Sequence, residues 1–273
     1  MIRSKAVLNT FFHLSDLLRK HKRVFFSRFG DGDIFIMDGK DQQNHHCSPE
    51  LQKEMLEAVR IEHPLYLKAV GANHPREKFM SRGCFAPFSI NSYLVEVLER
   101  VLGEECTEPF ENAVVFHYTT AFSSGLMNDF LDEFIRNKAI LYIGGLEKEI
   151  IEKVTGPKLD TVKTPMKDAY HCIESWWPEV LDKLDDAEVI IPSAGMASRV
   201  INKRLWNMGM EKHSIDIGSL FDALSGKRTR SWIRLLGHRM ESVVLPEYKS
   251  YSLTRSLKHA ALDARYFIRT LYR

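Results

Sequence analysis

The sequence predicts an α/β fold: a Rossmann-like, mostly parallel sheet with helices on both faces. Short apolar runs rich in Val, Ile and Phe alternate along the chain with longer segments whose apolar residues recur at helical spacing. A strand followed by a helix, repeated in this way, is typical of a parallel sheet. The chain has 273 residues, 44% of them hydrophobic, which is enough to bury one large core or two small ones.

The boundaries of the elements follow from these runs and from the residues between them. Ser48-Pro49-Glu50 and Ser89 are typical of helix starts, and Gly103 and Gly209 fall where helices should end. The expected strands are residues 24–27, 65–70, 113–117, 139–143, 161–163, 189–192 and 214–217. The expected helices are residues 4–21, 49–62, 89–102, 126–136, 146–154, 170–184 and 196–208.

Charge is divided unevenly along the chain. Residues 225–273 hold 11 Lys and Arg against 3 Asp and Glu, a net charge of +8, whereas residues 1–224 hold 27 against 33, a net charge of −6. We therefore expect a main domain over residues 1–224 and a basic helical extension over residues 225–273.

Within the extension, residues 252–273 are expected to form a basic amphipathic helix. Two interpretations stay open: the apolar stripe packs on the main domain, or the helix lies on an anionic membrane surface. Nucleic acid is not expected as a partner, because the extension has no recognised binding motif and no platform of aromatic residues. The stripe consists of Leu253, Leu257, Ala260, Ala261, Ala264, Phe267, Ile268 and Leu271, with Arg255, Lys258, Arg265 and Arg269 off it.

The cysteines and the hydropathy favour a cytoplasmic protein. The four cysteines show no CxxC spacing, and a chain of this size needs no disulfide bonds, so a reducing compartment is expected. The first residues do not resemble a signal peptide, and no run of about 18 apolar residues occurs. Membrane association would then be peripheral, on the inner face of the cell membrane.

The segment RFGDGD follows the first expected strand. Gly30 and Gly32 allow a tight turn and a close approach of the backbone to a ligand. Asp31 and Asp33 offer hard carboxylate oxygens to Mn²⁺ or Mg²⁺, and Arg28 offers a bidentate contact to an anion such as a diphosphate. The alternative is a structural Asp-Gly turn in which one aspartate caps a helix.

Three further loops carry polar residues after expected strands. The small residues of 192–198, with Gly195 and Ser198, would expose amide groups at a helix N-terminus to a phosphate or a ribose hydroxyl, or form a plain tight turn. Asp216 lies in or at the end of a strand, where a buried carboxylate needs a partner. His117 would offer a base to a sugar, or be an ordinary strand-end histidine.

The run Asn44-His45-His46-Cys47 contains the residue types of a zinc site. Consecutive side chains diverge, however, and no second cluster at zinc spacing completes four ligands. We therefore expect no zinc here.

Taken together, these segments resemble the GT-D-fold glycosyltransferases, a bacterial family with an Arg-Phe-Gly-Asp-Gly-Glu motif after the first strand. Arg28–Asp33 matches that motif with Asp in place of the final Glu. Thr164–Tyr170 is similar to the family's Pro-x-Lys-Asn-Ala-aromatic segment, Ser193–Ala197 to its Gly-Pro-x-Ala turn, and Asp216–Gly218 to its Asp-Ile-Gly. The resemblance spans residues 24–224, although many members carry a Ser-Arg pair where residues 122–125 read FSSG.

This resemblance implies a metal-dependent hexosyltransferase. A sugar would pass from a nucleotide-sugar, with UDP as the expected leaving group, to a glycan, a lipid-linked glycan or another hydroxyl acceptor in surface polysaccharide or glycoconjugate synthesis. Asp31 and Asp33 would hold the metal, and Asp216, His46 and His117 are the candidates for a general base.

Two other functions compete with this interpretation. Phosphohydrolases of the haloacid dehalogenase type also place two aspartates two residues apart after a first strand, but they usually follow the pair with Thr or Val, whereas Ile34-Phe35 follows here. The shortened acid at position 33 would also suit a non-catalytic protein that binds sugar nucleotides or assists assembly.

Overall fold

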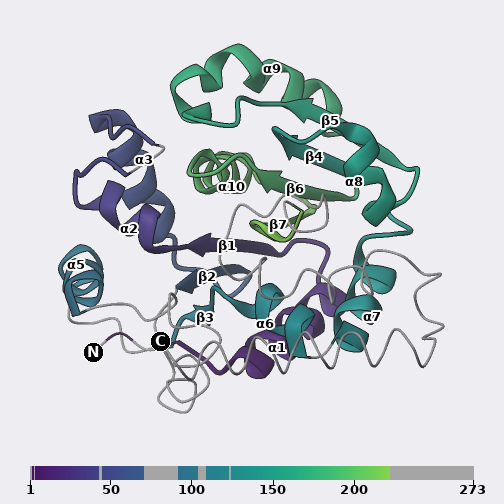
Figure 1. Ribbon diagram of the computed structural model, residues 1–273, viewed down its shortest axis with the longest axis horizontal. Helices are drawn as coiled ribbons and strands as arrows, with labels where there is room; N and C mark the ends of the chain where they lie inside the picture. The colour runs from purple at the N-terminus through teal and green to yellow at the C-terminus, as the bar shows by residue number, and fades with distance from the viewer. Residues whose placement is uncertain are drawn as a thin grey trace, which may run out of the picture.

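The computed structural model describes residues 2, 4–42, 45–70, 92–103, 109–122 and 124–221. In these residues, seven parallel strands form a single sheet in the order β3-β2-β1-β7-β6-β4-β5 (Figure 1). The strands are β1 (Phe25–Phe29), β2 (Tyr66–Val70), β3 (Glu111–Asn112), β4 (Ile140–Gly144), β5 (Leu159–Lys163), β6 (Val189–Ser193) and β7 (His213–Ile215). The predicted α/β class with a parallel sheet is confirmed.

Helices cover both faces of the sheet (Figure 1). The first face carries α1 (Val7–Lys20), α6 (Val115–Phe122), α7 (Ser124–Phe134) and α8 (Lys148–Thr155). The second face carries α2 (Asp31–Met37), α3 (Pro49–Val59), α5 (Ser92–Leu102), α9 (Ile173–Lys183) and α10 (Ala197–Asn207), with the short 3₁₀ turn η2 (Ala169–Cys172) before α9.

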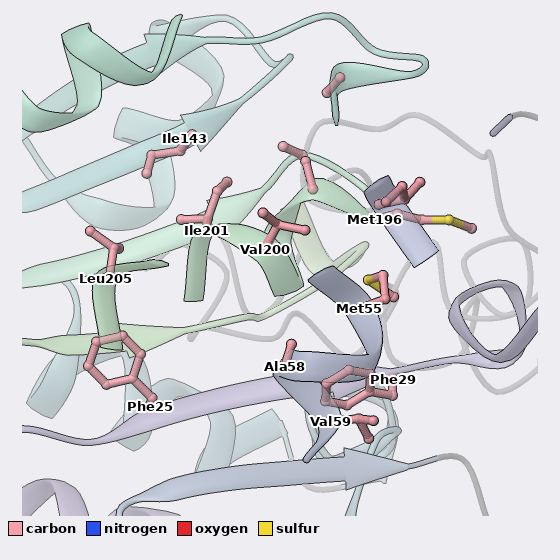
Figure 2. Close-up of a cluster of buried hydrophobic side chains, with 14 of the residues drawn as sticks. Phe25, Phe29, Met55, Ala58, Val59, Ile143, Met196, Val200, Ile201 and Leu205 are labelled. Carbon is pink, nitrogen blue, oxygen red and sulfur yellow. The ribbon is translucent and has the colours of Figure 1, made fainter. Parts of the chain in front are cut away.

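Each face buries its own apolar core, because successive side chains of a strand point to opposite faces. In β1, Phe25 and Phe29 join the core of the second face, and Phe26 joins that of the first. Figure 2 shows Val200, Ile201 and Leu205 of α10 among the side chains of the second core. Full burial of each such side chain contributes about 1.5–3 kcal/mol.

The chain leaves the central strand β7 toward a different face from its two neighbours. α2, after β1, and α10, after β6, pack on the second face. Leu220 and Phe221, after β7, join the core of the first face. Open α/β sheets bind ligands beyond the carboxyl ends of strands at such a change of direction. The topology therefore points to the loops that follow β1, β6 and β7.

Two predicted elements need correction. The strand expected at residues 113–117 is wrong: residues 115–122 form α6, and β3 has only two residues. The apolar run that suggested a strand ends in the first residues of this helix, which are buried, and the hydroxyls of Thr119 and Thr120 donate to the carbonyls one turn earlier, at 2.7 and 2.6 Å. Helix α2 was not expected, because its seven residues begin with Asp-Gly-Asp.

No helix in the described part of the chain is both long enough and apolar enough to cross a membrane. The extension at 225–273, with the amphipathic helix expected at 252–273, lies outside the described residues, as does the boundary expected at residue 224.

Candidate functional site

The RFGDGD motif spans the end of β1 and the start of α2, and its two aspartates face different surroundings. Gly30 precedes the helix, and its amide donates to Oδ2 of Asp33 at 2.8 Å. Asp33 is buried. Asp31 is exposed, and its Oδ1 accepts from the amide of Gly32 at 2.9 Å. Residues i and i+2 of a helix do not face each other, which explains the divergence.

A buried ion cluster lies at the carboxyl ends of β1, β6 and β7. Arg199, in the first turn of α10, donates through Nη2 to Oδ2 of Asp33 at 2.8 Å. Its Nη1 lies 3.3 Å from Oδ2 of Asp216 and donates to the carbonyl of Gly195 at 2.8 Å. The three charged side chains are 11%, 6% and 1% exposed, so solvent screens their charges little.

This burial shifts the pKa values of the cluster. Burial raises the pKa of Asp33 to about 6, although Arg199 and the Gly30 amide oppose the shift. Burial alone would lower the pKa of Arg199, but its ion pairs with Asp33 and Asp216 outweigh that effect and raise it. Oδ1 of Asp33 is buried without a hydrogen-bond partner in the described residues. With both carboxylates ionised, two negative charges face one positive charge, so the cluster favours a further cationic ligand.

Arg28 lies beside the loop after β7. Its Nε donates to the carbonyl of Ala113 at 2.6 Å. Its guanidinium packs against Gly218, whose φ of +64° belongs to the left-handed region. The amide of Gly218 in turn donates to Oδ1 of Asp216 at 2.9 Å. The segments predicted from Arg28–Asp33 and Asp216–Gly218 are therefore in direct contact.

His117 and Ser198 are both buried, and the side chain of each lies within hydrogen-bonding distance of another residue of the protein. His117 belongs to α6, and not to a strand end, and its Nε2 lies 3.4 Å from Oγ of Ser219. Ser198 accepts a hydrogen bond from the amide of Ala194 at 2.9 Å, which closes the turn between β6 and α10. A ligand-binding role for either side chain stays a prediction.

The turn at Gly195 is covered by His45. A Cβ built on Gly195, which has φ of +60°, would lie 2.9 Å from Cε1 of that imidazole. Nδ1 of His45 lies 4.0 Å from Oδ1 of Asp168, which also accepts from the amide of His46 at 2.9 Å. The side chain of His46 is exposed and pairs with Asp41. These residues border a small pocket lined by His45, His46, Leu51, Asp168, Ala169, Tyr170, His171, Ala194, Met196 and Ala197.

The sequence reasoning missed Arg199. It directly follows the small-residue turn at 192–198, and an Arg in the first turn of a helix, where the dipole favours acids, was a signal that it serves a buried anion. The remaining predicted residues are distributed over three adjacent strand ends, which bring Asp33, Gly195 and Asp216 together through Arg199.

The donor set for a divalent cation centres on Asp33, which presents the buried, unpaired Oδ1. Asp31 presents an exposed carboxylate that points away from Asp33, so it would have to turn to share a cation with it. Carboxylate oxygens are the ligands that Mg²⁺ and Mn²⁺ prefer. No group of three or more His, Cys, Asp or Glu side chains among the described residues is arranged to hold a metal. A bound cation would therefore draw its other ligands from a substrate or water.

Comparison with solved structures identifies the fold. The chain is similar to a protein described as a new glycosyltransferase (DUF1792) from Streptococcus sanguinis, with a TM-score of 0.62, 16% identity and 83% of each chain covered. It is also similar to a domain of unknown function 1792 described as having a distinct glycosyltransferase fold, with a TM-score of 0.56, 17% identity and 80% of this chain and 78% of the other covered.

A selenomethionine-substituted DUF1792 structure matches with a TM-score of 0.57 and 15% identity, over 83% of this chain and 80% of the other. No protein-family model matches the sequence, and no curated protein matches it either. At these identities the likeness establishes the fold, which is that of the DUF1792 glycosyltransferases.

Proposed function

We propose that this chain, which has the fold of the DUF1792 glycosyltransferases, is itself a metal-dependent glycosyltransferase. It transfers a sugar from a nucleotide-sugar, with UDP as the leaving group, to a hydroxyl of a glycan or lipid-linked glycan. One observation carries the proposal: the Asp33–Arg199–Asp216 cluster lies where the strand connections change face, in a fold that other proteins use for glycosyl transfer.

The chain's own residues have distinct parts in this reaction. Negative charge builds on the leaving diphosphate as the bond to the anomeric carbon breaks, and groups that stabilise this charge lower the barrier. Arg28 supplies a guanidinium, and the amides near Gly195 supply donors at the N-terminus of α10. A divalent cation held by Asp31 and Asp33 would neutralise the diphosphate further.

The acceptor hydroxyl must lose a proton when it attacks. Asp216 is joined to one of the proposed diphosphate contacts, since its Oδ1 accepts from the amide of Gly218, against which Arg28 packs. His46 is exposed at the rim of the pocket, and the side chain of His117 contacts Ser219. We therefore propose Asp216, in preference to either histidine, as the general base.

The thermal shift of the purified protein with UDP, GDP, ADP and CMP, each with and without Mn²⁺, tests this function. A nucleoside diphosphate that binds the folded state should raise Tm, because ligand binding adds to the free energy of unfolding. We expect UDP to stabilise the protein only when Mn²⁺ is present. The Asp31→Asn, Asp33→Asn double variant should fold and lose this response.

Either of two results would remove the assignment. Full metal-dependent turnover by the double variant would show that the aspartates do not hold the metal. The absence of any nucleotide response would favour the phosphohydrolase or the non-catalytic protein instead, and trapping of a phospho-enzyme would distinguish these two.

A further inference from the structure

Arg199 connects carboxylates that belong to two different strand ends. Asp33 follows β1 and Asp216 follows β7, and the only cation that pairs with both in the described residues is Arg199. Each carboxylate also accepts a backbone amide, from Gly30 and from Gly218, through one oxygen. The guanidinium and these amides together restrict the rotation of both side chains.

We propose that Arg199 is a positioning residue for the transfer reaction. By pairing with Oδ2 of Asp33 it leaves Oδ1 of that residue, which is buried and unpaired, for the ligand. By pairing with Asp216 it sets the position of the proposed base relative to the proposed cation. This inference rests on the proposed function, because it concerns the same site.

The planar guanidinium is necessary for this role. Its separate Nη atoms reach two carboxylates at once, at 2.8 and 3.3 Å, and Nη1 also donates to the carbonyl of Gly195. A lysine would bring the same charge on a single ammonium group, which lacks the fork geometry. Charge and positioning can therefore be separated by substitution.

Binding of Mn²⁺ alone distinguishes the two roles. If Arg199 acted only through its charge, Arg199→Gln would leave two uncompensated carboxylates and Mn²⁺ would bind more tightly. If it positions Asp33, the same substitution should weaken Mn²⁺ binding by about 10–100-fold, the usual effect of losing a residue that orients a metal ligand. Arg199→Lys should give an intermediate loss.

The experiment follows the electron paramagnetic resonance signal of free Mn²⁺ during titration of the full-length wild type and the variants. Arg204→Gln is the matched control: it removes the same charge from the same helix, but Arg204 pairs with Glu54 and Glu174 away from the site. We expect the control to bind Mn²⁺ as the wild type does. Equal or tighter binding by Arg199→Gln would overturn the positioning role.

A crystal structure of Arg199→Gln provides a readout that does not depend on catalysis. We expect the carboxylates of Asp33 and Asp216 to take new rotamers in it, and unchanged rotamers would overturn the inference even if the variant is inactive. Failure of the wild type to bind Mn²⁺ would instead refute the metal assignment in the proposed function, and the crystal structure would then decide the role of Arg199 alone.

Discussion

The guanidinium of Arg28 occupies the space that a side chain at position 218 would need. A Cβ built on Gly218 would lie 1.5 Å from Nη1 of Arg28, far inside any permitted contact. The glycine therefore has two independent reasons to be there: its φ of +64°, and the arginine packed against its α-carbon.

Gly218→Ala should abolish nucleotide binding as well as reduce stability. The substitution must displace Arg28, and the left-handed backbone alone costs an alanine about 1–2 kcal/mol. Gly209→Ala is the matched control, because Gly209 has φ of +73° but no atom within 4 Å of the added Cβ. Both variants should melt at lower temperature, and only Gly218→Ala should lose the UDP·Mn²⁺ thermal shift. Retention of the shift by Gly218→Ala would show that Arg28 does not contact the ligand.

The two aspartates of the RFGDGD segment should differ in their effect on stability. Asp33→Asn removes a buried ion pair with Arg199 and also a negative charge that burial disfavours, so it should change the free energy of unfolding by about 1–3 kcal/mol. Asp31→Asn changes an exposed side chain and should leave it unchanged. Urea denaturation of the two single variants at pH 7.5 measures both effects. Similar destabilisation by both would contradict the buried and exposed assignments.

The raised pKa of Asp33 predicts a specific pH dependence. Its folded value of about 6 lies above the ordinary 3.8, so between these values the folded state holds the proton more firmly than the unfolded state. The contribution of Asp33 to the free energy of unfolding should therefore rise by about 1 kcal/mol as the pH falls from 7.5 to 5. The Asn side chain of Asp33→Asn cannot titrate. The difference in the free energy of unfolding between wild type and variant, measured at both pH values, therefore isolates this gain.

His213 should have the opposite effect to Asp33 on how stability changes with pH. Burial lowers the pKa of His213 to about 4 from the ordinary 6.5, so the unfolded chain takes up a proton there before the folded protein does. The stability that neutral His213 contributes is complete above pH 6.5 and is lost as the pH falls toward 4. His213→Gln should make the protein less sensitive to acid over this range. Denaturation curves measure the free energy of unfolding of wild type and variant at pH 7 and pH 5. An equal loss of stability in both proteins on acidification would refute this prediction.

The basic extension gives a test of its own. If residues 252–273 lie on an anionic membrane surface near a lipid-linked acceptor, the intact protein should bind vesicles that contain anionic lipid, and more weakly at high salt. Deletion of residues 250–273 should abolish this binding and leave the UDP·Mn²⁺ thermal shift intact. Absence of binding by the intact protein, or binding unaffected by the deletion, would favour packing of the helix on the main domain.

The sequence was sufficient to locate the acidic residues of the site, but not to orient them. Asp33 and Asp216 could be found because each follows a short apolar strand, and parallel strands end at one edge of the sheet. The place of Arg199 in the first turn of a helix was a signal for a buried anion, but its two partners could not be predicted, since the direction of a helical side chain depends on how α10 packs against β1 and α3. The opposite orientations of Asp31 and Asp33 were missed for a related reason: α2 begins within the motif that we expected to be a loop.

The residues at 113–117 show a second limit of local patterns. An apolar run bounded by polar residues suits a strand and a buried helix equally, and length does not separate them when the helix has eight residues. Tertiary packing decides: Val115 and Phe116 are buried against α1 and α7 in the core of the first face.

The position of β7 also has a consequence for how the chain reaches its native state. Within the described residues, β7 is the only strand that pairs with both β1 and β6, and it is the last to be synthesised. Until residues 213–215 leave the ribosome, the β3-β2-β1 and β6-β4-β5 groups each present an unpaired edge and share no strand pairing. Closure of the sheet by such long-range pairing is slow, so a nascent chain stalled before β7 would be prone to aggregation. The same late step would assemble the ion cluster, since Asp216 arrives with it.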